Sequence, residues 1–145
     1  IERGYSFPTV NTLWKIATGL KIPLSSFFQQ GKNSYTVIDW REQPVVPEED
    51  GAMRAYLLFP FDPVVSSEGF YIEFDAGCRH ASDRHEEGVE ELVFVLEGKL
   101  DLILDGVRVT VGSKQAIRFR ADIPHVYENP YTGICSVHNT IFYRR

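Results

Sequence analysis

Three polar side chains stand where the surrounding pattern favours apolar residues, and together they could bind a metal ion. Glu91 opens an apolar run and shares a face of the predicted strand with Val93, while His125 alternates with Tyr127 on one face and His85 lies in a polar segment before Glu91. A buried carboxylate is costly unless it is paired or bound to a metal. Two imidazoles and one carboxylate are the donors of a facial-triad iron site, and they also suit zinc or manganese. The alternative from the same residues is a hydrogen-bonded polar cluster without a metal.

The elements that must position these residues are predicted to be short strands. From residue 35 onward, segments rich in β-branched and aromatic residues alternate with turn clusters, which is typical of a sandwich or barrel. Strands are predicted at Tyr35–Trp40, Met53–Phe59, Phe70–Phe74, Leu92–Leu96, Leu100–Leu104, Val107–Val111, Ala116–Phe119 and Ile134–Tyr143, and turns at Pro44–Gly51, Pro60–Gly69, Asp105–Gly106 and Asn129–Gly133. The Asp-Gly pair predicts a two-residue hairpin, because a type I′ turn needs positive φ at both positions.

The first thirty residues instead have a helical period. Leu13, Ile16, Ala17 and Leu20 fall on one helical face, and Pro23 stops that helix soon afterwards. The chain opens with an isoleucine and its single methionine is at position 53, so we expect the sequence to be part of a longer polypeptide.

Composition limits the class of protein. The chain has 145 residues, a formal net charge of −5 and 43% hydrophobic residues, as in an ordinary globular protein. The acidic balance disfavours nucleic-acid binding by this stretch alone. No apolar run approaches the roughly 20 residues that span a bilayer, and no secretory signal opens the chain. Cys78 and Cys135 are predicted to be reduced thiols, so we expect a cytoplasmic protein without a membrane contact.

The spacing around the three candidate ligands resembles the two motifs of the cupin family. The first motif is similar to Gly77, His85, Glu91 and Gly98, and the second to the segment Pro124–Asn129, in which three residues separate the histidine from the asparagine. The resemblance implies a mostly β fold, the cupin double-stranded β-helix or jelly-roll barrel. The first motif usually carries two histidines separated by one residue. Here one is absent, and either Glu87 or Asp83 takes its place.

A second resemblance covers residues 1–30, which look like the second half of a Cro-like helix-turn-helix domain. The matching segments are Ile1–Gly4, Pro8–Thr9, Thr12–Ala17, Leu20 and Ser25–Phe28. The recognition helix of that family ends near the first segment, so DNA binding is expected from the full-length protein only. The expected division is a helix-turn-helix remnant at 1–30, a linker and first strand at 31–52, and a cupin domain at 53–145.

Together the resemblances imply an XRE/Cro-like transcriptional regulator with a C-terminal cupin sensor. A divalent metal (zinc, iron or manganese) would be held by His85, Glu91 and His125. A small-molecule effector would meet further residues, namely Glu87, Tyr127, Asn129 and His138. A homodimer is expected, partly because the run Leu92–Leu96 is apolar on both faces, so each face of this strand must be covered by other residues. The alternative function is a metal-dependent oxygenase similar to the iron-dependent cupin epoxidases, in which the same triad would activate oxygen.

Overall fold

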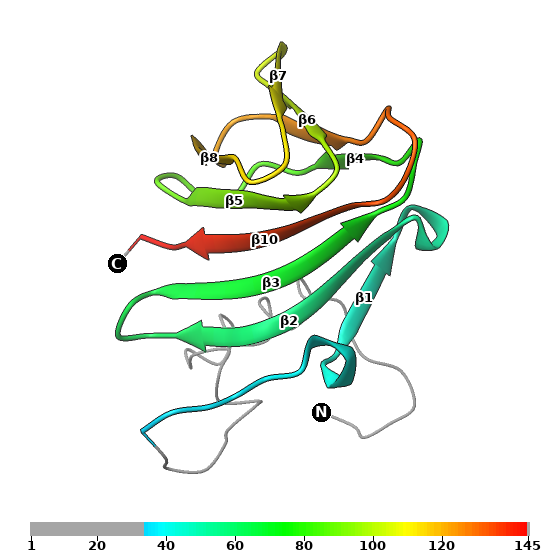
Figure 1. Cartoon of the computed structure of the whole chain (residues 1–145). Helices are drawn as coiled ribbons and strands as arrows, with labels where there is room; N and C mark the ends of the chain where they lie inside the picture. The colour runs from blue at the N-terminus through cyan, green and yellow to red at the C-terminus, as the bar shows by residue number, and fades with distance from the viewer. Residues whose placement is uncertain (1–33, 145) are drawn as a thin grey trace.

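The computed structural model describes residues 34–144, and the expected helical remnant at 1–30 lies outside them. The described part is mostly β and antiparallel, as predicted (Figure 1). Its elements in chain order are the 3-10 turn η2 (Trp40–Glu42), β1 (Val45–Glu48), the 3-10 turn η3 (Glu49–Gly51), β2 (Met53–Asp62), β3 (Ser67–Phe74), β4 (Arg79–Ser82), β5 (Glu90–Glu97), β6 (Leu100–Leu104), β7 (Val107–Val111), β8 (Ala116–Arg120), β9 (His125–Glu128) and β10 (Cys135–Phe142).

The strands form two sheets that close a jelly-roll barrel. The six-stranded sheet has the order β1-β2-β3-β10-β5-β8, and the four-stranded sheet has the order β4-β9-β6-β7. The last strand, β10, lies between β3 and β5, so it joins segments that are far apart in the sequence (Figure 1). This crossover matters for the site, because side chains from β3, β10 and β5 face the same interior.

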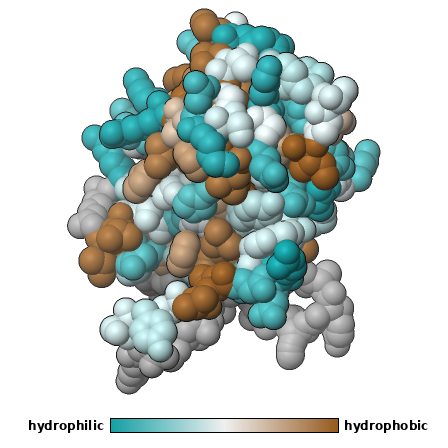
Figure 2. All heavy atoms as spheres, in the orientation of Figure 1, coloured by the Kyte–Doolittle hydropathy of each residue, from teal (hydrophilic) through white to brown (hydrophobic). Residues whose placement is uncertain are grey.

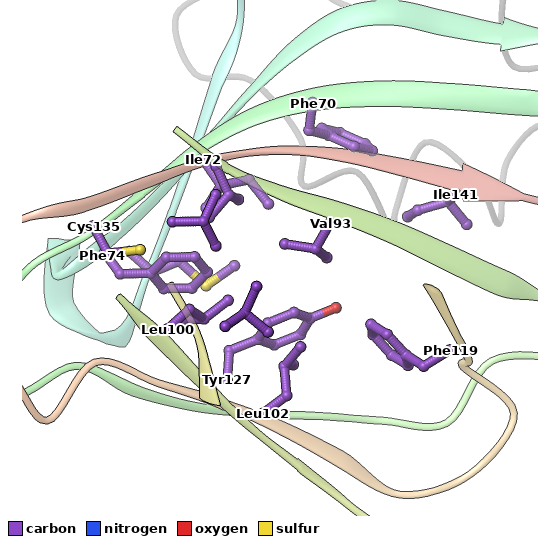
Figure 3. Packing of buried hydrophobic residues seen from close by; sticks show 14 of the residues in the cluster. Phe70, Ile72, Phe74, Val93, Leu100, Leu102, Phe119, Tyr127, Cys135 and Ile141 are labelled. Carbon is purple, nitrogen blue, oxygen red and sulfur yellow. The ribbon is translucent and has the colours of Figure 1, made fainter. Parts of the chain in front are cut away.

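The barrel is filled by apolar side chains from both sheets. Phe74, Leu100 and Leu102 are fully buried, and Figure 3 shows the Tyr127 ring among them with its hydroxyl directed toward the Phe119 end. Along β5, Val93 and Val95 are buried whereas their neighbours Leu92, Phe94 and Leu96 are half-buried. Both cysteines are free and buried, and burial raises the pKa of the Cys135 thiol to about 12, as expected of an unreactive thiol.

The predicted hairpin between β6 and β7 is confirmed. Asp105 and Gly106 both have positive φ, at 51° and 87°, and Leu104 pairs with Val107 across the turn. These angles are those of a type I′ turn, whose twist matches the flanking strands.

Three predictions about the secondary structure were wrong. The segment Tyr35–Trp40 is not a strand: it is irregular and ends in η2, where the Asp39 carboxylate accepts a hydrogen bond from the Arg41 amide. β propensity alone does not make a strand where no neighbouring edge pairs with it. The predicted turn at 44–51 contains β1, an edge strand on which Pro47 is tolerated. The turn predicted at 60–69 is limited to residues 63–66, because β2 continues to Asp62 and β3 begins at Ser67.

The surface is mixed in character. Figure 2 shows apolar side chains in separate groups among polar ones on the face in view. Among residues 34–144, no helix has the length and apolar character needed to cross a membrane.

Candidate metal centre

Three candidate ligands converge in the barrel interior. Glu91 is the second residue of β5, His125 is the first residue of β9, and His85 lies in the loop between β4 and β5. One ligand atom from each falls within 4.8 Å of the others. His85 Nε2 lies 3.0 Å from Glu91 Oε2, and His125 Nε2 lies 3.6 Å from the same oxygen. The sequence therefore predicted correctly that these side chains meet.

The orientation of His125 favours metal binding. Its Nδ1 lies 2.8 Å from the carbonyl oxygen of Ile123, so Nδ1 carries the proton and donates it. Its Nε2 is buried and has no hydrogen-bond partner among the described residues. A backbone carbonyl that fixes the tautomer in this way is the usual support for a histidine that ligates a metal through its other nitrogen.

The carboxylate of Glu91 is held from both sides. Its Oε1 accepts hydrogen bonds from the Tyr127 hydroxyl and from Asn139 Nδ2, the latter at 3.0 Å. Burial opposes ionisation of this group, but the nearby His125 imidazole and the hydrogen bonds with His85 and Tyr127 outweigh it and lower the pKa of Glu91 to about 2. Glu91 is therefore a carboxylate at neutral pH, with Oε2 turned toward the two imidazoles.

The loop that carries His85 is tied to the segment just before His125. The amide of His85 donates to Ala121 O at 2.9 Å, and the amide of Ala121 donates to Val89 O at 2.9 Å. The amide of Gly88 donates to Asp122 Oδ2 at 2.9 Å, and the hydrogen bond from Arg120 together with this contact lowers the pKa of Asp122 to about 2. His85 is 24% exposed in its side chain, whereas Glu91 and His125 are buried, so the site opens on the His85 side.

The donor set fits a divalent metal ion. Two imidazoles and one ionised carboxylate, with an orphaned buried nitrogen on His125, match the ligands that zinc, iron and manganese take. Three protein ligands leave coordination positions open for a small molecule or water.

The four residues predicted to bind the effector fall in different places. Tyr127 is buried and reaches the site through Glu91. Asn129 is buried away from it, with Nδ2 donating to Phe74 O and Gly133 O, a structural role. Glu87 is exposed on the His85 loop. His138 lies on the opposite, outer face of the six-stranded sheet, because Val137 and Asn139 on either side of it are the buried residues of β10.

His138 lines an outer cleft of about 870 Å³ instead of the barrel interior. The cleft lies between residues 36–38 and the strands β2, β3 and β10, and it includes Phe59 and Gly69. A Cβ atom placed on Gly69 would come within 3.6 Å of His138 Nε2. The one-residue alternation along a strand therefore separates His138 from the candidate metal centre.

Sequence reasoning missed three polar residues of the interior. Asn139 occupies an inward position of β10 where alternation favours an apolar residue, which is the signal that could have found it. Glu68 was assigned to a turn, but it is an inward residue of β3. Tyr143 donates to Glu68 from just beyond β10. No local pattern predicted that contact, because it joins residues 75 positions apart.

Comparisons with known proteins agree with this architecture. The cupin domain family matches residues 70–141. The chain is 40% identical to the HTH-type transcriptional regulator SutR of Escherichia coli over 146 aligned positions, which cover all of this chain and 78% of that protein.

Two solved structures are also similar. The cupin domain of an XRE family transcriptional regulator from Enterobacter cloacae has 36% identity and a TM-score of 0.63, covering 65% of this chain and 99% of that one. An HTH_3 family transcriptional regulator from Vibrio cholerae has 31% identity and a TM-score of 0.70, covering 97% of this chain and 75% of that one.

Proposed function

Because this chain belongs to the family of helix-turn-helix transcriptional regulators that carry a cupin domain, we propose that its barrel senses a small molecule with the help of a divalent metal held by His85, Glu91 and His125. The observation that carries this proposal is the buried Nε2 of His125, which has no hydrogen-bond partner within residues 34–144 and lies 3.6 Å from the Glu91 carboxylate beside His85. A packed interior without a ligand would leave that nitrogen uncompensated.

Each residue has a distinct task in this proposal. His125 offers Nε2 because the Ile123 carbonyl fixes its tautomer. Glu91 supplies the negative charge, and Tyr127 and Asn139 hold its second oxygen away from the imidazoles. His85, the exposed member, lies where an effector enters. A bound divalent metal would supply the positive charge that attracts a carboxylate or hydroxyl oxygen of the effector.

Effector binding must favour one of two states of the regulator in order to control DNA binding. A ligand that binds both states equally shifts nothing, however tightly it binds. We propose that the full-length protein is a cytoplasmic homodimer, in which occupancy of the two barrels changes how the helix-turn-helix domains reach operator DNA. The partners are then an effector, DNA and a second copy of the chain.

Metal binding tests the sensor half of the proposal. The full chain is stripped with a chelator and titrated with Zn²⁺, Mn²⁺ or anaerobic Fe²⁺ while heat release and melting temperature are followed. Wild type is expected to bind one ion per chain, and His85→Ala and His125→Ala are expected to lose at least about tenfold in affinity. His138→Ala is the matched control, because His138 lies on the outer face of the six-stranded sheet. Saturable binding that survives both ligand substitutions would contradict the proposal.

A second assay separates the regulator from the oxygenase alternative. The full-length protein is mixed with operator DNA in a gel-retardation experiment, with and without candidate small molecules. We expect a ligand-dependent change in retardation and no oxygen uptake by the Fe²⁺-loaded protein. Oxygen consumption coupled to conversion of a small molecule would favour the enzyme instead.

A further inference from the structure

A second buried carboxylate lies inside the barrel and takes no part in the candidate metal centre. Glu68 is 1% exposed and occupies an inward position of β3. It pairs with Ile141 of β10, and Ile141 pairs on its other side with Glu91 of β5. Glu68, Ile141 and Glu91 therefore form one row across three adjacent strands. With about 4.8 Å between neighbouring strands, the two carboxylate-bearing positions are roughly 10 Å apart.

The two oxygens of Glu68 have different surroundings. Oε2 accepts a hydrogen bond from the Tyr143 hydroxyl. Oε1 is buried and has no hydrogen-bond partner within residues 34–144, and no lysine or arginine in that range forms an ion pair with this carboxylate. Burial raises the pKa of Glu68 to about 7 against the opposing effects of Tyr143 and His85. A buried carboxylate oxygen normally accepts a hydrogen bond, and the described part of the chain supplies no donor to Glu68 Oε1.

Glu68 and the metal ligand Glu91 face the same interior of the six-stranded sheet, because they flank Ile141 on its two sides in one cross-strand row. The Tyr143 hydroxyl donates to Glu68 from just beyond β10. Tyr143 is fixed there by an edge-on contact with the Phe61 ring, with 5.6 Å between ring centroids. A molecule that enters beside His85 and lies over Ile141 would therefore have the metal ligands near one end and Glu68 Oε1 near the other.

We propose that Glu68 determines effector specificity by accepting a hydrogen bond from a protonated amine of the effector, so that the effector class is a small amino acid-like zwitterion. This inference rests on the proposed sensor function, in which an oxygen of the effector binds at the metal centre. A cationic amine suits Glu68, because it donates to the oxygen that lacks a partner and favours the ionised carboxylate, with which no basic side chain in the described range forms an ion pair. The roughly 10 Å between the two backbone positions leaves room between the inward side chains for a zwitterion whose amine and carboxylate are joined by a short carbon chain.

The test compares matched probes on the zinc-loaded full chain. Glycine, β-alanine, 4-aminobutyrate and 5-aminopentanoate are each titrated beside the acid that lacks the amine, such as butyrate for 4-aminobutyrate. We expect at least one amino acid to bind about tenfold or more tightly than its amine-free counterpart. Glu68→Gln should abolish that preference while leaving zinc affinity and the affinity for the amine-free acid unchanged.

Two further variants keep the test decisive. Glu73→Gln makes the same chemical change on an outward position of the same strand and should retain the preference. Glu68→Asp keeps the charge and should retain part of the preference, which covers the case in which the glutamine variant fails to fold. The inference is overturned if every amino acid binds no better than its amine-free match, a result that would indicate a buried water as the partner of Oε1. It is also overturned if no probe binds. Failure of the wild-type chain to bind zinc would instead contradict the proposed function itself.

Discussion

Removing the Tyr127 hydroxyl should weaken both the barrel and its candidate metal centre. In Tyr127→Phe the ring remains in the core, so the change is confined to the hydrogen bond that the hydroxyl donates to Glu91 Oε1. Asn139 still donates to that oxygen at 3.0 Å, so the carboxylate keeps one of its two partners there. The substitution therefore tests the support of Glu91 without changing the donor atoms of the site.

The magnitude follows from the charge on Glu91. A hydrogen bond to a charged group contributes about 1.5–3 kcal/mol to the free energy of unfolding. At about 4 °C per kcal/mol for a domain of this size, the melting temperature should fall by roughly 6–12 °C in the presence of a chelator. Loss of a group that orients a metal ligand typically reduces metal affinity by about 10–100-fold, which competition with a chromophoric chelator would measure.

Tyr131→Phe is the matched control. Tyr131 also donates to a buried carboxylate, at 2.8 Å to Asp101 Oδ1, but Asp101 is not a member of the candidate metal centre. This variant should lose stability and keep wild-type metal affinity. The reasoning is refuted if Tyr127→Phe binds metal as tightly as wild type, or if both tyrosine variants lose metal affinity equally.

Three other substitutions should separate structural roles from binding roles. Asn129→Ala removes three hydrogen bonds, one buried and two part-buried, and should cost about 3 kcal/mol in the free energy of unfolding, seen in urea denaturation, with metal affinity unchanged. Glu68 has a pKa raised from 4.5 to about 7, so the folded state holds a proton that the unfolded state releases. The free energy of unfolding should fall by up to about 3 kcal/mol as the pH rises through that window, and a flat profile for Glu68→Gln relative to wild type would verify the assignment. Asp122→Asn should loosen the His85 loop and lower metal affinity by up to about tenfold in the same competition assay, whereas unchanged affinity would show that the loop is positioned by its backbone contacts alone.

The candidate site was predictable from sequence to the extent that it depends on strand alternation. Glu91 and His125 were found because each stands on the face of its strand that buries apolar neighbours. The same rule, applied to β10, places Asn139 inside and His138 outside, so the prediction that His138 joins the pocket ignored information present in the sequence. Asn129 was predicted to bind the effector because of its position in the second motif, but in the structure its side chain donates hydrogen bonds to backbone carbonyls.

Other features depend on long-range contacts that no local pattern encodes. Glu68 meets Tyr143 because β10 crosses between β3 and β5, which brings together residues 75 positions apart. The short polar strand β4 has no apolar alternation and is held by its pairing with β9. The segment 35–40 shows the converse: its β-branched and aromatic residues suit a strand, but it runs alone until η2, where Trp40 packs against Tyr56. Residues with high β propensity form a strand only where a neighbouring strand pairs with them.

The most direct measurement of the central claim is X-ray absorption spectroscopy of the zinc-loaded full chain, repeated on His125→Ala. We predict a first shell with two imidazole nitrogens at about 2.0–2.1 Å and a carboxylate oxygen at a similar distance, with one imidazole lost in the variant. A shell containing sulfur, or one with no imidazole, would contradict a metal centre built from His85, Glu91 and His125. So would a spectrum that is identical in wild type and variant.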